Sequence, residues 1–181
     1  MSGRVDKRRI AIPLAVSLVG LGGWLLQGSV TGESDRPRSE DLPGVHIMLD
    51  DEDAQRAHQS FQQAVAMLQA GEFDYAVTAL HNVLAIYPTL PEAHVNMGFA
   101  LLGLDNPEAA ADFFDTASTL RPSLHNAYYG LGLAERENGN DKAALAAMQA
   151  YAHLAAENDR HLPQAQEIIW ELQAETGGAS Q

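Results

Sequence analysis

Residues 91–122 read PEAHVNMGFALLGLDNPEAAADFFDTASTLRP, and this stretch decides the fold. In both of its halves, apolar residues recur every three or four positions, which is the spacing of an amphipathic helix. The polar segment LDNP at 104–107 separates the halves. The pattern therefore predicts one helix at about 91–103 and a second at about 107–120. Pro122 closes the second helix, because proline cannot continue one.

The same pattern recurs on both sides of this stretch with a period of 34 residues. The shift aligns small residues with small ones and large residues mostly with large ones, in the sets Ala64, Gly98 and Gly132; Gly71, Asp105 and Gly139; Ala76, Ala110 and Ala144; Leu80, Phe114 and Met148; Val83, Ala117 and Tyr151; and Pro88, Pro122 and Ala156. Small side chains allow two helices to approach closely. The repeat therefore predicts three helix pairs, at about 57–90, 91–124 and 125–158.

A further helix is expected after the third pair, at about 161–175. Its apolar residues fall on one face at helical spacing: Leu162, Ala165, Ile169 and Leu172. Such a helix would cover the exposed end of the array, as repeat arrays require. The predicted fold is all-α, an α-solenoid of three helix pairs plus this capping helix over residues 50–176, followed by a disordered tail at 177–181.

The charge of the chain is unevenly distributed. The 181 residues carry 11 Lys and Arg against 24 Asp and Glu, a formal net charge of −13, with no cysteine. The acidic balance argues against a nucleic-acid partner, and the absence of cysteine excludes disulfides and thiolate metal sites. The basic residues Arg4, Lys7, Arg8 and Arg9 lie together at the N-terminus. Residues 1–9 therefore form a basic stub that precedes an acidic remainder.

An uncharged stretch, IAIPLAVSLVGLGGWLL at 10–26, follows the stub. As a helix it would be about 26 Å long, near the lower limit for crossing a bilayer. We expect a single transmembrane signal-anchor helix at 10–27, with the basic stub in the cytoplasm. A cleaved signal peptide and a buried core helix are the alternatives, although the exit LLQGSVTGES has no A-x-A cleavage pattern.

Residues 28–49 mix Gly, Ser, Pro and charges without a helical period, so we expect a flexible linker there. The predicted location of the protein is the bacterial inner membrane, crossed once, with the repeat domain in the periplasm.

The repeats resemble the tetratricopeptide repeat family. The middle unit follows the family pattern as His94-x-x-Met97-Gly98, Ala110-x-x-x-Phe114 and Pro122. The third unit has Ala156 in place of the proline, and the first unit has Gln63-Ala64 in place of Leu-Gly. The resemblance covers a little over half of the chain, at about 57–158. It implies a right-handed superhelix whose concave groove is lined by the first helix of each pair.

By this resemblance, a partner-binding groove would be lined by largely apolar first-helix residues: Phe61, Val65, Leu68, Val95, Asn96, Phe99, Leu102, Tyr129, Leu133 and Arg136. Asn96 matches one asparagine of the carboxylate clamp found in some members, but the basic clamp residues are absent. Part of the set could instead belong to the interhelical core or lie under the linker. If the groove is real, Phe99→Arg is expected to leave the fold and its melting temperature nearly unchanged.

No acid–base pair, nucleophile motif, phosphate-binding loop or metal-ligand spacing is found in the sequence, so we expect neither an enzyme nor a cofactor, metal or small-molecule substrate. The predicted function is a membrane-anchored scaffold that binds protein partners. It would serve in assembly of an envelope or membrane complex, such as cytochrome c maturation or translocon-associated chaperoning. The alternatives are an integral structural subunit of a larger membrane machine and a secreted periplasmic repeat protein.

Overall fold

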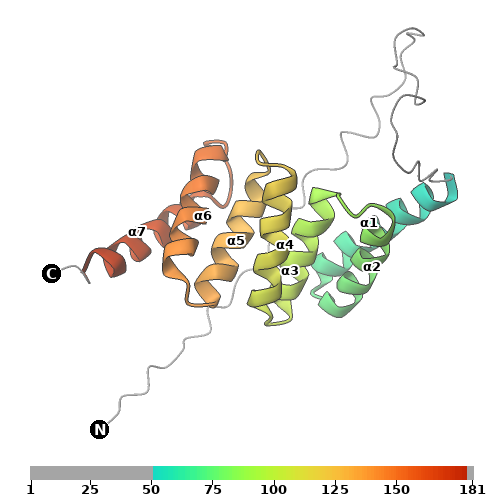
Figure 1. Cartoon of the computed structure of the whole chain (residues 1–181), viewed down its shortest axis with the longest axis horizontal. Helices are drawn as coiled ribbons and strands as arrows, with labels where there is room; N and C mark the ends of the chain where they lie inside the picture. The colour runs from blue at the N-terminus through green and yellow to red at the C-terminus, as the bar shows by residue number, and fades with distance from the viewer. Residues whose placement is uncertain (1–50, 179–181) are drawn as a thin grey trace, which may run out of the picture. The chain divides into compact units, whose positions relative to one another are not determined.

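The computed structural model describes residues 51–178, which form seven helices (Figure 1). Their bounds are α1 Asp51–Ala70, α2 Phe73–Ile86, α3 Pro91–Gly103, α4 Pro107–Leu120, α5 His125–Glu137, α6 Asp141–Leu154 and α7 Leu162–Gly178. The predicted helices at 91–103 and 107–120 are confirmed as α3 and α4. Both begin with a proline, whose fixed φ and missing N–H suit the first turn of a helix.

The helices pack as consecutive pairs. α1 packs against α2, α3 against α4, and α5 against α6, while α2 contacts α3 and α4 contacts α5. The first helices also touch one another, α1 with α3 and α3 with α5. The pairs therefore stand side by side in sequence order, as Figure 1 shows from cyan to orange. This arrangement confirms the predicted solenoid of three helix pairs.

Two glycines receive the ring of Phe114, whose side chain is fully buried. A Cβ atom at Gly98 would lie 2.7 Å from Phe114 Cζ, and one at Gly130 would lie 2.1 Å from Phe114 Cε1. Gly98 belongs to the same pair as Phe114 and Gly130 to the next. The ring therefore fills the space toward the following pair, which is the reason for the small residue at the Gly98 position.

The turns between paired helices repeat one backbone conformation. Gly71, Asp105 and Gly139, which align at the 34-residue period, all have positive φ, at 76°, 61° and 77°. Glycine adopts this left-handed region without steric cost, whereas Asp105 does so as the only non-glycine residue of the described range. The 34-residue period therefore reflects a repeated turn conformation as well as repeated helix packing.

The last helix, α7, packs against α6 through three buried residues, Ala165, Ile168 and Leu172. Ile169, expected on this face, is only half-buried, and Ile168 takes its place in the contact. α7 ends at Gly178, so it includes the first two residues of the segment 177–181 for which a tail is expected.

The predicted basic stub 1–9, transmembrane helix 10–27 and linker 28–49 lie outside the described residues. Within residues 51–178, no helix combines the length and apolar character needed to cross a bilayer.

Candidate functional site

The residues expected to line a groove lie on α1, α3 and α5, and we call them together the first-helix face. Most are buried. Eight of the ten have exposed fractions between 2% and 8%: Phe61, Leu68, Val95, Asn96, Phe99, Leu102, Tyr129 and Leu133. Val65 and Arg136 are partly exposed. The contacts of α3 with both α1 and α5 bring the three parts of the set together.

Phe99 also belongs to the core between the repeats. Its ring meets the Phe114 ring edge-on, with the centroids 4.9 Å apart, and only 4% of its surface is exposed. Because Phe99→Arg would place a cation against this buried ring, it is expected to destabilise the fold. The burial of Phe99 therefore favours a lower melting temperature for this variant over the unchanged one expected from the sequence, and Val65 is the better position from which to probe this face.

Tyr129 and Arg136 belong to the part of the face on α5, and the side chains of both contact α7 through polar interactions. The Tyr129 hydroxyl donates to Gln164 Oε1 at 2.9 Å, and Arg136 Nη2 forms an ion pair with Glu171 Oε2 at 2.6 Å. Each contact joins residues 35 apart in sequence, one more than the period of 34. α7 therefore occupies the place of the first helix of a fourth pair.

Asn96 is the one buried polar residue among those whose side chains the structure describes, with 2% of its surface exposed. No hydrogen bond links its side-chain amide to another described residue. Its neighbours along the same face of α3 are the apolar Val95 and Phe99. An amide both donates and accepts hydrogen bonds, so this position suits the backbone of a partner segment.

Glu92 lies one helical turn before Asn96. Its Oε1 accepts from Arg121, which follows α4 in the same pair. Its Oε2 is buried and has no hydrogen-bond partner. Sequence reasoning did not identify Glu92, because a carboxylate in the first turn of a helix is ordinary and only the structure shows which oxygen lacks a donor.

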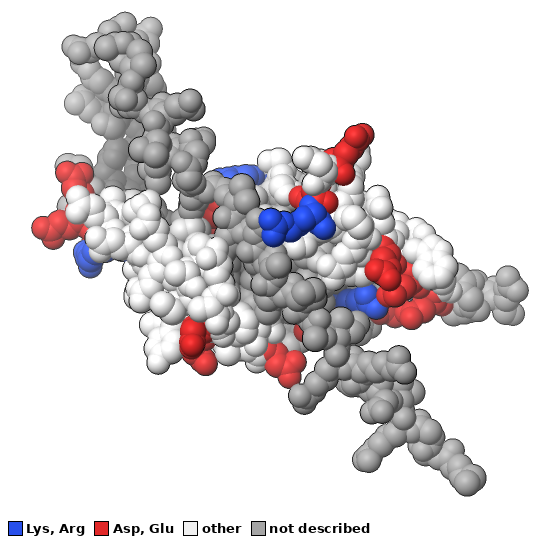
Figure 2. All heavy atoms as spheres, turned by 180° about the vertical axis from the view of Figure 1, so that it is seen from behind, with Lys and Arg blue, Asp and Glu red and all other residues white. Residues whose placement is uncertain are grey.

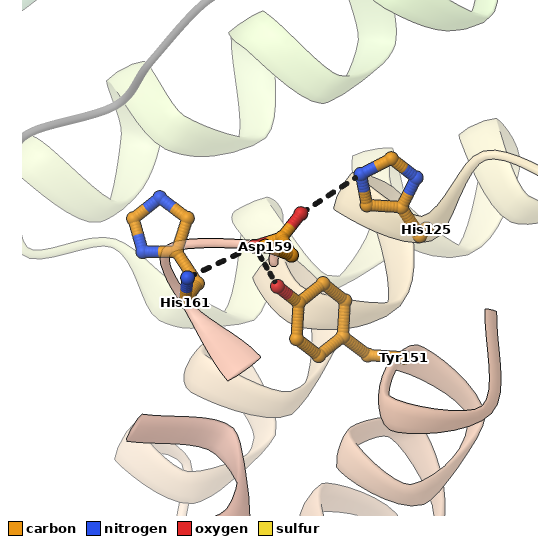
Figure 3. A network of polar contacts seen from close by, with 4 residues as sticks. All are labelled: His125, Tyr151, Asp159 and His161. Atoms are coloured by element: carbon orange, nitrogen blue, oxygen red, sulfur yellow. Dashed lines mark hydrogen bonds and ion pairs between the residues drawn. The ribbon is translucent and has the colours of Figure 1, made fainter. Parts of the chain in front are cut away.

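A second polar cluster holds the loop between α6 and α7 (Figure 3). Asp159 accepts from the Tyr151 hydroxyl at 2.5 Å and from the backbone N–H of His161 at 2.9 Å, and His125 Nε2 lies 3.4 Å from its Oδ2. The His161 ring also packs on Tyr129, with 4.9 Å between the centroids. The loop is thus tied to both α5 and α6.

These contacts shift several pKa values. Burial alone would raise the pKa of Asp159, but the bonds from Tyr151 and His161 and the charges of the two histidines hold it below its usual value. Burial, together with the charge of Asp159, raises the pKa of Tyr129 to about 12. Burial lowers the pKa of His161, and Asp159 partly opposes that shift. The arrangement stabilises the loop before α7.

The surface of the described part is acidic. Residues 51–178 contain eighteen Asp and Glu against five Lys and Arg, and carboxylates outnumber basic groups on the face drawn in Figure 2. Within the described residues, no three His, Asp or Glu side chains are grouped so as to hold a metal ion.

Comparison with known proteins supports the repeat assignment. Residues 67–131 match the sequence family described as tetratricopeptide repeat. The fold is similar to that of the Sgt2 TPR domain from Aspergillus fumigatus, with a TM-score of 0.62 and 19% identity, over 68% of this chain and 80% of that one.

Two further similar structures contain bound peptides. One is the first TPR of Spaghetti (RPAP3) bound to the HSP90 peptide SRMEEVD, with a TM-score of 0.62 and 18% identity, over 68% of this chain and 97% of that one. The other is the Yersinia enterocolitica type III secretion chaperone SycD with a peptide of the translocator YopD, with a TM-score of 0.63 and 9% identity, over 67% of this chain and 95% of that one. The chain therefore has the fold of tetratricopeptide repeat proteins, and its residues 67–131 match the tetratricopeptide repeat sequence family.

Proposed function

We propose that this protein is a non-enzymatic scaffold that binds a segment of a partner protein on the first-helix face. Structures with the same fold hold peptides of HSP90 and of YopD. The observation that carries the proposal here is Asn96, a buried residue whose amide has no hydrogen bond to another described residue and whose neighbours Val95 and Phe99 are apolar. A peptide offers both a backbone N–H and a C=O to such an amide, together with apolar side chains for its neighbours.

Binding on this face requires it to open, since most of its side chains are buried. Each repeat of a solenoid contacts mainly its neighbours, so small rotations between repeats add up to a change in curvature. We expect such rotations at the contacts of α3 with α1 and α5. We expect the partner segment to enter along α3.

The charge of the protein also restricts the ligand. The HSP90 peptide bound to RPAP3 ends in EEVD, whereas the described part of this chain is strongly acidic. Like charges oppose association. We therefore expect this protein to reject acidic peptide tails and to bind a neutral or basic segment.

The proposal includes a membrane anchor at residues 10–27, with the repeat domain in the periplasm of a bacterium and a role in assembling an envelope or membrane complex. Its support is the order of the sequence, in which a basic stub precedes an uncharged stretch. The mass of the mature protein tests it. An intact N-terminus and release only by detergent agree with an anchor, whereas a mass lacking the first residues overturns it.

Photo-crosslinking in native membranes tests partner binding. A photoreactive amino acid at Val65, which is partly exposed on the first-helix face, is expected to form one dominant adduct that mass spectrometry identifies. The control carries the same probe at Ala146, which is exposed on α6. Asn96→Ala is expected to remove the Val65 adduct. Equal adducts at both positions, or an adduct that survives Asn96→Ala, would refute binding on this face.

A further inference from the structure

The first turn of α3 contains a carboxylate oxygen that nothing satisfies. Glu92 shares one oxygen, Oε1, with Arg121, while Oε2 is buried and has no donor. An ionised carboxylate accepts at both oxygens, and leaving one of them buried without a donor costs more than for a neutral group. The Arg121 side chain is 44% exposed, so its charge is divided between Glu92 and water.

Asn96 lies one helical turn after Glu92 on α3. Residues four apart in a helix are neighbours on one face, so Glu92 and Asn96 follow each other along α3. Val95 and Phe99 flank them with 4% exposure each. One turn of α3 therefore presents an unsatisfied acceptor and an unpartnered amide within apolar surroundings.

The position of Glu92 at the start of a helix accounts for its charge but not for the missing donor. A carboxylate in the first turn complements the helix dipole, and α4 has a similar acid, Glu108, which is exposed and hydrated. Glu92 differs because its Oε2 is withdrawn from water. A bound partner can supply this donor, and a cation suits a surface with this excess of carboxylates.

We propose that Glu92 and Asn96 together form a binding site for one lysine or arginine within an apolar segment of a partner protein. The cationic group donates to Glu92 Oε2, and the backbone of the segment bonds to the Asn96 amide. Apolar residues of the segment pack on Val65, Val95 and their neighbours. This site rests on the proposed function and specifies the residue by which the partner is recognised.

A phage-displayed library of random twelve-residue segments tests the site with the full chain as bait in detergent. On the wild-type protein, the enriched segments are expected to be apolar with one Lys or Arg. The strongest of them, made as a fluorescein-labelled peptide, should lose about tenfold in affinity or more when that cation is changed to Gln. Rising salt should weaken the cationic peptide more than its Gln form.

The variant Glu92→Gln tests whether Glu92 causes the preference for a cationic segment, and Glu108→Gln is the matched control. Glu92→Gln should select segments without a preferred cation and should bind the Lys and Gln peptides about equally, whereas Glu108→Gln should behave like the wild type. Circular dichroism at rising temperature verifies that each variant is folded. Arg121→Gln is a second variant, expected to retain the preference for a cation, because Arg121 does not touch Oε2.

The outcomes separate the two proposals. If the wild-type protein selects neutral apolar segments and Asn96→Ala abolishes their binding, the cation site is refuted while the scaffold function is supported. A cation preference that survives Glu92→Gln would overturn the assignment to Glu92. Failure to enrich any segment on the folded wild-type protein would contradict both.

Discussion

The exchange of Gly130 for alanine tests the packing between the second and third repeats. An added Cβ would lie 2.1 Å from Cε1 and 2.3 Å from Cζ of Phe114, whereas carbon atoms in contact are about 3.5–4.0 Å apart. The ring would have to move by more than about 1 Å. It has little room to do so, since Gly98 lies close on its other side and Phe99 packs on its edge.

The magnitude follows from two opposing effects. Alanine favours the helix over glycine by about 1 kcal/mol, while overpacking of a filled core costs about 1–3 kcal/mol and occasionally more. With a rigid, fully buried ring we expect the upper end, a net loss of about 2 kcal/mol. For a domain of this size, that corresponds to roughly 6–10 °C in melting temperature.

Gly132 in the same helix provides the control. A Cβ there would lie 2.8 Å from both Cγ and Cε of Met148, an overlap about half as deep as at Gly130, and an unbranched methionine chain adapts more readily than a ring. Gly132→Ala is therefore expected to stay within about 1 kcal/mol of the wild type. Urea unfolding followed by circular dichroism at 222 nm measures both variants. If the two variants are equally stable, the Phe114 contact does not limit the approach of the repeats.

Three further predictions concern single positions. Asp105→Gly should stabilise the protein by about 1 kcal/mol by relieving the positive φ of 61°; a lower midpoint in urea would contradict this. Asp159→Asn should destabilise it at neutral pH. Because the pKa of Asp159 is lowered in the folded state, its contribution is present above the usual value of 3.8 and is lost as the pH falls through the folded value. Melting curves of both proteins should therefore converge in acid, and a constant difference would refute the assignment. Val65→Arg should leave the melting temperature nearly unchanged, since Val65 is only partly buried, whereas Phe99→Arg should lower it strongly; equal melting temperatures would contradict their different burial.

The repeat could be predicted from the sequence because its signals are periodic. The spacing of Gly98, Ala110 and Phe114 expresses contacts that recur in each pair, so alignment at 34 residues exposes them. The alignment also placed Asp105 at the position of Gly71 and Gly139, and only the structure shows that all three have positive φ. The spacing of apolar residues and the polar segment between them also predicted where α3 and α4 begin and end.

The polar features could not be predicted in this way. Asp159 lies in the loop after the last pair, outside the period, and its three partners come from α5, from α6 and from the same loop just before α7. Whether an oxygen of Glu92 lacks a donor depends on the position of Arg121 across the pair. The burial of Phe99 likewise depends on how α3 meets its neighbours, and periodicity alone does not distinguish a residue on a binding face from one in the core.

The central position of α3 has a consequence for how the array unfolds. Nine of its thirteen residues are buried, and it touches α1, α2, α4 and α5. The end helix α7 makes no such contact and can fray without disturbing it, but α3 cannot open unless both neighbouring pairs separate. Its amide protons should therefore exchange with deuterium only through unfolding of the whole array, while those of α7 exchange through local opening.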